Sequence, residues 1–235
     1  MMAPLIITLD GPAGSGKSTV ARQLAARLGL EFLDTGAMYR GLAAQCLDNR
    51  IDPAGEPEKV AQLAEAVWVG FDWSIDPPQL LVGDRPMTDR LREPDVTGAV
   101  SEVAAIPAVR RVLVAHQQRI GCEHPRLVSE GRDQGSVVFP DAPLKFYLDA
   151  TVEVRARRRT AQFRAASQEV DEAQILESIT RRDHTDARRA DGPLICPADA
   201  VRIDTSAMML DAVVAELESV ARGRLGAVLR SRSQS

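Results

Sequence analysis

The residues best suited to chemistry form an eight-residue segment near the N-terminus, Gly11-Pro-Ala-Gly-Ser-Gly-Lys-Ser18. This spacing is typical of a phosphate-binding loop, because glycines let backbone N–H groups converge on phosphate oxygens and the helix that follows adds its positive end. In such a loop Lys17 reaches the β- and γ-phosphates, and the Ser18 hydroxyl ligates Mg²⁺. We therefore predict a nucleotide site formed by Gly11, Pro12, Ala13, Gly14, Ser15, Gly16, Lys17, Ser18 and Thr19.

Two neighbours of this loop each have two interpretations. Thr19 either donates a hydrogen bond to the α-phosphate or is an ordinary residue of the first helical turn. Asp10, at the end of the apolar run before the loop, either helps to hold Mg²⁺ through water or has a structural role. The residues alone leave both alternatives open.

A second set of anion-binding candidates is rich in arginine. Nine arginines fall between residues 151 and 189, although the net charge of the chain is −4. Helical spacing places two groups of charged residues on common faces. They are Arg155, Arg158 and Arg159 in the first group, and Arg182, Asp186 and Arg189 in the second. The alternative is a solvated, charged helix face. Taking both groups together, we predict a lid that closes over phosphates.

This second arginine set favours a kinase over the other classes of phosphate-loop protein. The motif Asn-Lys-x-Asp, with which GTPases read guanine, is absent from the sequence. A module that senses ATP without turnover needs only one phosphate site, whereas a kinase brings two polyanions together. The predicted nucleotide is therefore ATP, acting as a phosphoryl donor.

The elements that must position these groups alternate between strand and helix. Short apolar runs predict strands, and a 3.6-residue apolar period predicts helices. The predicted strands cover residues 5–9, 31–33, 126–129, 144–148 and 201–203, and the predicted helices cover 17–28, 39–47, 108–120, 152–166, 173–189 and 208–220. This alternation predicts an α/β fold with a parallel sheet, in which ligands bind outside the carboxyl ends of the strands.

Residues 51–95 differ in composition from the alternating strands and helices around them. They contain six prolines and two apolar stretches, at 67–73 and 79–82. Gly83-Asp84 predicts a turn into residues 85–88. We therefore predict a small antiparallel sheet inserted into the α/β core. Trp68 and Trp73 fall within this insert, and we interpret both as part of its core rather than as a ligand platform.

Composition excludes several other classes. Of the 235 residues, 45% are hydrophobic, 26% charged and 4% aromatic, which argues against a nucleic-acid binder that needs a basic or aromatic face. The three cysteines have no Cys-x-x-Cys spacing, which indicates reduced thiols rather than a zinc site or disulfides. The first apolar run has five residues, too few for a signal peptide or membrane span. We expect a cytoplasmic protein without a membrane partner.

Five motifs, in this order, carry a resemblance to a known family. They are Asp34-Thr-Gly-Ala-Met-Tyr-Arg40, Glu130-Gly-Arg-Asp-Gln-Gly135, Val137-Val-Phe-Pro-Asp141, Arg155-Ala-Arg-Arg-Arg159 and Arg182-Asp-x-x-Asp186-x-x-Arg189. From about residue 4 to 222 the chain resembles the bacterial cytidylate kinases, which are nucleoside-monophosphate kinases with a phosphate loop. Gln134 is a departure, since the family more often has an aliphatic residue there.

The resemblance implies a monomer with a single kinase domain. Its core, a five-stranded parallel sheet flanked by helices, would comprise residues 4–34, 104–151 and 167–222. Residues 35–103 would form the monophosphate-binding region with the inserted sheet, and 152–166 an arginine-rich helical lid. A frayed tail would cover residues 223–235.

The resemblance also implies residue roles. The CMP site would comprise Thr35, Arg40, Ser101, Arg110, Arg132, Asp133, Arg182, Asp186 and Arg189. Catalytic roles would fall to Lys17, Arg132, Arg158 and Arg189, additional ATP contacts to Arg155 and Arg159, and Mg²⁺ binding to Ser18 and Asp10. Three points stay open: Thr35 also suits a helix cap, Arg132 and Asp133 also suit a local ion pair, and Arg188 competes with Arg189 for the substrate.

The activity implied by the resemblance is the ATP-dependent phosphorylation of CMP and dCMP to CDP and dCDP, with Mg²⁺ as cofactor. One alternative is a kinase for another pyrimidine monophosphate, UMP or dTMP, on the same scaffold. The other is the non-catalytic ATP-sensing module that the second arginine set disfavours.

Overall fold

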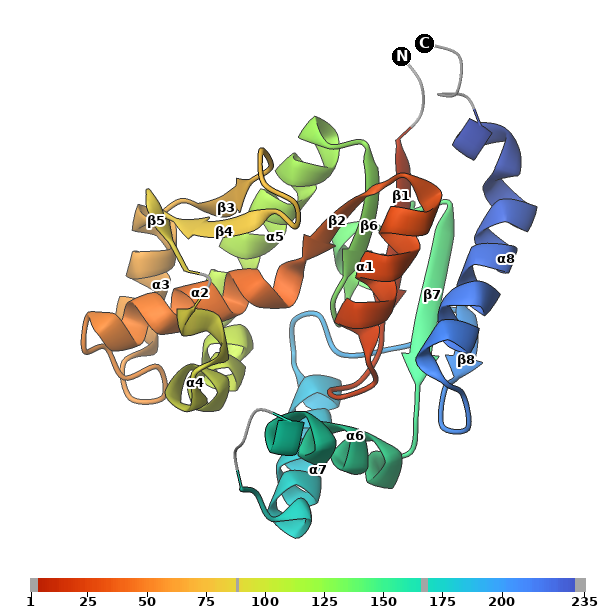
Figure 1. The fold of residues 1–235 in the computed structure, drawn as a ribbon. Coiled ribbons are helices and arrows are strands. Elements are labelled where there is room, and N and C mark those ends of the chain that lie inside the picture. The colour runs from red at the N-terminus through yellow and green to blue at the C-terminus, as the bar shows by residue number, and fades with distance from the viewer. Residues whose placement is uncertain (1–3, 88, 166–168, 231–235) are drawn as a thin grey trace. The chain divides into compact units, whose positions relative to one another are not determined.

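The computed structural model describes residues 4–87, 89–165 and 169–230 (Figure 1). The chain divides into two compact units, one made of residues 1–31 and 126–235 and the other of residues 32–125.

The first unit is built on parallel strands. These are β1 (Leu5–Asp10), β6 (Arg126–Glu130), β7 (Leu144–Asp149) and β8 (Val201–Asp204). They belong to a five-stranded sheet of order β2-β6-β1-β7-β8, in which β2 (Glu31–Asp34) is an edge strand. The fully buried β1 lies at the centre, between β6 and β7, as its uninterrupted apolar run predicts. The predicted α/β class and parallel sheet are confirmed.

Among the residues of this unit that the structure describes, there are also four helices and one short turn. The helices are α1 (Lys17–Leu28), α6 (Val152–Ala165), α7 (Glu172–Arg188) and α8 (Leu210–Arg230), and the π-helical turn is η2 (Gln134–Val138). In α1, Val20, Leu24 and Leu28 recur every fourth residue and are buried. Gly29 ends the helix in the left-handed conformation, with φ 63°. Helix α8 packs against α1, and α6 against α7 (Figure 1).

The second unit contains the inserted sheet. Strands β3 (Val69–Asp72), β4 (Gln79–Val82) and β5 (Arg85–Pro86) form an antiparallel sheet in that order, which confirms the predicted insert. Its helices are α2 (Thr35–Asp48), α3 (Pro57–Ala66), α4 (Pro94–Ala105) and α5 (Pro107–Glu123), with a 3₁₀ turn, η1 (Arg90–Arg92), before α4.

The prediction that both tryptophans are core residues is wrong for Trp68. Its side chain is 41% exposed, and its ring leaves no room for a Cβ at Gly70. Trp73 is half-buried, stacks on His124 with ring centroids 4.0 Å apart and also meets Phe71. The insert therefore uses one tryptophan for packing and leaves the other at the surface.

Helices α3 and α4 were not predicted, because the prolines and apolar stretches of residues 51–95 predicted an antiparallel sheet alone. In the structure Pro57 and Pro94 are instead the first residues of these helices. Proline suits this position, since its fixed φ matches the helix and its missing N–H would have no partner there. The same residue type that argues against a helix interior thus begins two helices.

Two further boundaries differ from the prediction. Helix α2 begins at Thr35 instead of residue 39, and α8 continues to Arg230, so residues 223–230 are helical rather than a frayed tail. Residues 231–235, together with Thr88 of the predicted hairpin and Ala166 of the predicted lid, lie outside the described residues.

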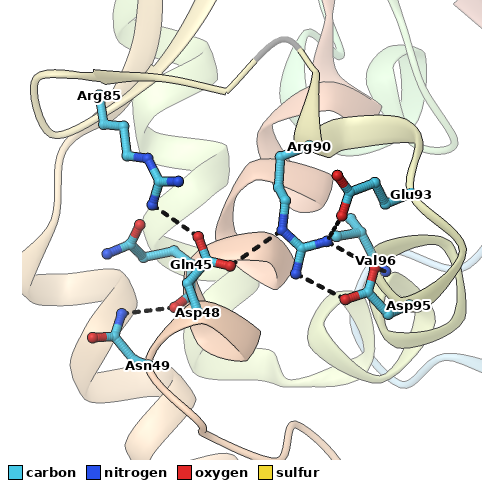
Figure 2. Close-up of polar contacts among 8 residues, drawn as sticks. All are labelled: Gln45, Asp48, Asn49, Arg85, Arg90, Glu93, Asp95 and Val96. Atoms are coloured by element: carbon cyan, nitrogen blue, oxygen red, sulfur yellow. Dashed lines mark hydrogen bonds and ion pairs between the residues drawn. The ribbon is translucent and has the colours of Figure 1, made fainter.

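An ion-pair network joins the end of α2 to the inserted sheet and to the elements that follow it (Figure 2). Asp48, at the end of α2, accepts hydrogen bonds from Arg85 of β5 and from Arg90 of η1, at 2.8 and 3.1 Å. Arg90 also donates twice to Asp95 in the first turn of α4, at 2.8 Å each. Within this unit the network fixes the start of α4, which carries Ser101, to α2, which carries Arg40.

Candidate active site

The phosphate loop lies between β1 and α1, as predicted. At Gly11, φ is 151° and a Cβ would lie 2.0 Å from the carbonyl oxygen of Leu148, so only glycine fits. Gly14 and Gly16 have φ of 76° and 86°, and Gly16 precedes the first residue of α1. These three glycines give the loop the positive φ values that a side chain would oppose.

Lys17 is buried within this loop, with 5% of its surface exposed. Its Nζ donates to the carbonyl oxygen of Pro12 at 2.7 Å. Burial, together with the positive charge of Arg132, lowers the pKa of Lys17 from 10.5 to about 7, while Glu130 opposes the shift. Because the folded pKa is depressed, the burial cost is full below pH 7 and disappears as the pH rises to 10.5. An anionic ligand would relieve this cost by restoring the ammonium form.

Glu130 is a site residue that the sequence reasoning missed. It ends β6, is 4% exposed and lies opposite Leu9 in the sheet register. Its Oε1 accepts a hydrogen bond from the Ser18 hydroxyl at 2.7 Å. A signal was present, since an acidic residue ends a buried strand inside the Glu130–Gly135 motif.

The oxygen donors beside the loop suit Mg²⁺. A magnesium ion bound with nucleotide takes one or two protein oxygens and completes its shell with phosphates and water. The Ser18 hydroxyl and the Glu130 carboxylate supply such oxygens at one place. Within residues 4–87, 89–165 and 169–230, no group of three or more His, Cys, Asp or Glu side chains forms a dedicated metal cage. The arrangement fits a metal that arrives with its nucleotide.

The geometry around Asp10 favours the structural alternative over a metal ligand. The carboxylate is 1% exposed, and its two oxygens accept the backbone N–H groups of Gln134 and Gly135, at 2.8 and 2.7 Å. Burial raises the pKa of Asp10 to about 6, against the lowering effect of these two hydrogen bonds. Asp10 thus holds the turn that follows Arg132 and Asp133.

Arg132, Asp186 and Arg189 form a buried cluster. Asp186 accepts from Arg132 Nε at 2.9 Å and from Arg189 Nη2. Burial alone would raise the pKa of Asp186, yet the charges of Arg132 and Arg189 hold it below its usual value. Arg132 therefore forms an ion pair with Asp186, while the alternative of a local pair with Asp133 stays a prediction. Two arginines share one carboxylate, which leaves positive charge for an anion.

Arg155 supports the phosphate loop from α6. Its guanidinium donates to the carbonyl oxygens of Ala150 and Ala13, both at 2.9 Å, and pairs with Asp183 at 2.7 Å. The side chain is buried, so these contacts use it within the protein. The structure shows that Arg155 binds the backbone of the phosphate loop at Ala13. Its predicted contact with ATP stays a prediction.

Arg158 and Arg159 lie in different surroundings. Arg158 donates to the hydroxyl and carbonyl oxygens of Thr205, at 3.0 and 2.6 Å, in the loop between β8 and α8. Arg159 lies along its own helix, 4.5 Å over the ring of Phe163 and 3.2 Å from Gln162 Oε1. These contacts favour a structural role for Arg158 over the predicted catalytic one, while Arg159 stays a candidate for ATP.

For Arg158→Ala we expect a loss of stability with little change in turnover. Removing hydrogen bonds made by a charged group costs about 1.5–3 kcal/mol, whereas a catalytic arginine would lower kcat by far more than about threefold. Thermal unfolding and steady-state kinetics of the same preparation measure both effects. Arg157→Ala, an exposed arginine on the same helix, is the matched control and should change neither quantity. A tenfold lower kcat in a stable Arg158→Ala protein would restore the catalytic prediction.

Asp133 and Arg182 also lie in the first unit, where Arg182 of α7 is close enough to lower the pKa of both Lys17 and Asp186. The other predicted CMP residues, Thr35, Arg40, Ser101 and Arg110, lie in the second unit. Asp34 caps α2 by accepting from Ala37 N at 2.8 Å, and it pairs with Arg40 at 2.9 Å. The cap alternative for Thr35 is therefore wrong, because Thr35 is the first residue of the helix and is buried. Asp34, which begins the first family motif, is a contact residue that the sequence analysis missed.

Arg110 of α5 is 2% exposed. Its Nη1 donates a hydrogen bond to the Tyr39 hydroxyl at 3.4 Å. Like the pair of Asp34 with Arg40, this contact was not predicted from the sequence. Ser101 lies half-buried on α4. Within residues 32–125, Arg40 and Arg110 are therefore both held by neighbouring side chains.

Comparison with known proteins identifies the family. The family model described as cytidylate kinase matches residues 7–222, which is most of the chain. The chain belongs to the cytidylate kinase family. The cytidylate kinase of Rhodococcus opacus is 46% identical over 226 residues, covering 94% of this chain and 96% of the relative. That of Mycobacterium leprae is 43% identical, covering 97% of this chain and 100% of the relative. This cytidylate kinase family member is thus a phosphotransferase, as predicted.

A solved structure shares the fold at low identity. An uncharacterized protein from Eubacterium ventriosum is 14% identical, with a TM-score of 0.50, and the match covers 94% of this chain and 99% of that chain. This similarity shows that the two proteins share a fold, and nothing more.

Among the described residues, no helix has the length and apolar character needed to cross a membrane.

Proposed function

We propose that this protein transfers the γ-phosphoryl group of ATP to CMP and dCMP, forming ADP with CDP or dCDP. The proposal rests above all on a second anion-binding arrangement near the phosphate loop. Arg132, held by Asp186, is close enough to Lys17 to lower its pKa. A nucleotide sensor has no use for this second positive group, whereas a kinase needs it for the acceptor phosphate.

The chemistry requires charge compensation more than proton transfer. The acceptor phosphate is an anion at neutral pH, so one of its oxygens attacks the γ-phosphorus directly as the bond to the β-phosphate oxygen breaks. In this proposal Lys17 holds the transferring group from the donor side, and Arg132 and Arg189 hold the acceptor phosphate. Mg²⁺, held beside Ser18 and Glu130, would neutralise the β- and γ-phosphates. Closure of α6 and α7 would exclude water.

We also propose the class of substrate, the oligomeric state and the location of the protein in the cell. A net charge of −4 and the paucity of aromatic residues support small-molecule substrates rather than nucleic acid. We propose a monomer that acts in the cytoplasm.

A panel of acceptors tests the function. ADP release is measured by a coupled assay with MgATP and, in turn, CMP, dCMP, UMP and dTMP. We expect CMP and dCMP to give the highest kcat/KM. Preference for UMP or dTMP would contradict the proposal, and no turnover with any acceptor would favour the sensing alternative.

Asp133→Asn tests how the base is read. Cytosine offers an N4 amino donor where uracil has an acceptor oxygen, and a carboxylate can only accept. Asp133 is 4% exposed, so an unpaired uracil oxygen beside it would cost about 1–3 kcal/mol, or roughly 5- to 150-fold. An asparagine amide presents either a donor or an acceptor. We therefore expect Asp133→Asn to lose CMP activity and to bring the CMP/UMP ratio of kcat/KM toward one.

The ratio is measured for wild type and variant at saturating MgATP. Asp141→Asn, an exposed aspartate beyond the same turn, is the matched control and should keep the wild-type ratio. A strong CMP preference retained by Asp133→Asn would show that another group reads the base.

A further inference from the structure

The segment that carries Arg132 and Asp133 is attached at both of its ends to the end of β1. On one side, Gly131 N donates to the carbonyl oxygen of Leu9 at 3.1 Å, which continues the β1–β6 ladder. On the other side, Gln134 N and Gly135 N donate to the two carboxylate oxygens of Asp10, at 2.8 and 2.7 Å. Arg132 and Asp133 therefore lie between two anchor points on consecutive residues of β1.

The hydrogen bonds to Asp10 give acceptors to two backbone N–H groups, of Gln134 and Gly135, that have none within the turn itself. In η2, Val137 N and Val138 N donate to Asp133 O, and Phe139 N donates to Gln134 O. The first N–H groups of a helical turn have no acceptor within it. Asp10 supplies that acceptor from another element, with one oxygen for each N–H and almost no exposure to water.

The contact is close packed as well as hydrogen bonded. A Cβ at Gly135 would lie 2.9 Å from Thr8 Oγ1 and 3.3 Å from Asp10 Oδ2. The turn therefore rests directly on β1, and a methyl group would lift it. The side chain of Gln134, the departure from the family pattern, is buried, and its Oε1 accepts from Ser129 Oγ at 2.7 Å.

We propose that Asp10 is a positioning residue for the acceptor side of the site, which fixes Arg132 and Asp133 in the geometry that binds CMP. Asp10 directly precedes Gly11, the first residue of the phosphate loop. One strand end thus sets the distance between the donor loop and the residues that hold the acceptor. This inference rests on the proposed function for the identity of the acceptor.

Two variants disturb the contact from opposite sides. In Asp10→Asn, the amide oxygen can accept from only one of the backbone N–H groups of Gln134 and Gly135. The amide NH₂ group, which is a donor, faces the other N–H. In Gly135→Ala, the carboxylate stays and the added methyl displaces the turn. For both we expect CMP affinity, measured by calorimetry in EDTA without ATP, to fall at least about tenfold. Affinity for MgADP should change by less than about threefold.

Thr8 provides a rescue and a control. Its Oγ1 is buried and has no hydrogen-bond partner among the residues that the structure describes, so Thr8→Ala should keep wild-type CMP affinity. Because Thr8 Oγ1 is the atom nearest to the added methyl, Thr8→Ala should restore part of the CMP affinity lost in Gly135→Ala, with Lys145 Cδ at 3.1 Å still close to the methyl. Thermal unfolding of Gly135→Ala and of the double variant measures whether a general loss of folding contributes to the change in affinity.

Amide hydrogen exchange gives a readout that does not depend on CMP. We expect residues 131–139 to exchange faster in Asp10→Asn than in wild type, while β7 is unchanged. Unchanged exchange, or wild-type CMP affinity in both variants, overturns the inference. So does a loss of MgADP affinity with CMP affinity intact, which indicates a metal role for Asp10. A wild-type chain that fails to bind CMP instead overturns the proposed function, and the exchange comparison still decides whether Asp10 fixes the turn.

Discussion

Replacing Lys17 by alanine is expected to lower kcat for CMP phosphorylation by at least about 100-fold, because charge stabilisation at the transferring group is the largest catalytic term in phosphoryl transfer. The fold should survive, since Lys17 is a buried cation whose pKa is lowered to about 7 and whose removal relieves a burial cost. Steady-state kinetics with saturating CMP and MgATP, together with thermal unfolding, measure both quantities.

Lys59→Ala is the matched control for this substitution. Lys59 is exposed on α3 and pairs with Glu56 three residues before it, so its loss should leave kcat unchanged. Near-normal turnover in a folded Lys17→Ala protein would contradict the assignment of residues 11–18 as the donor site.

Replacing Asp186 by alanine is expected to produce the largest loss of stability. Removing one partner of a buried ion pair typically costs about 3–5 kcal/mol, because the remaining charge stays buried without compensation. Here Arg132 and Arg189 lose their shared carboxylate, and the side chains of Asp186 and Arg189 are 6% and 7% exposed. We expect a lower free energy of unfolding in urea and a raised KM for CMP, since both arginines lose their orientation.

Glu218 offers a control with the same chemistry at the surface. It also accepts from two arginines, Arg27 and Arg222, but its pairs are exposed. Glu218→Ala should cost less than about 1 kcal/mol and leave the KM for CMP unchanged. If Asp186→Ala were as stable as Glu218→Ala, the cluster would not be an energetically coupled, buried unit.

Local patterns in the sequence were enough to predict the donor loop and the sheet that carries it. The glycines at 11, 14 and 16 adopt the positive φ values that their spacing requires, and α1 has the predicted limits of residues 17–28. Strand β4 likewise spans the predicted residues 79–82. These predictions succeed because backbone freedom at glycine and apolar period are properties of neighbouring residues. The family could be recognised for a similar reason, since its motifs are short runs of residues.

Residue type alone does not predict where a helix begins, as two prolines of this protein show. Pro57 and Pro94 begin α3 and α4, but the sequence of residues 51–95 predicted only a small antiparallel sheet there. A proline favours the first turn of a helix and opposes its interior, so its meaning depends on where the helix starts. That start is set by packing of the apolar face, which includes the buried Val60 and Val96.

Only the tertiary structure decided which partner each charged side chain has. The sequence places Arg155, Arg158 and Arg159 on one helix face, yet Arg155 holds the loop backbone at Ala13 and Arg158 holds Thr205. Asp10 and Glu130 come beside their partners Gly135 and Ser18 through contacts more than a hundred positions apart in the chain. An arginine or carboxylate binds whichever complementary group lies within about 3 Å, and the strand order of the sheet determines that group.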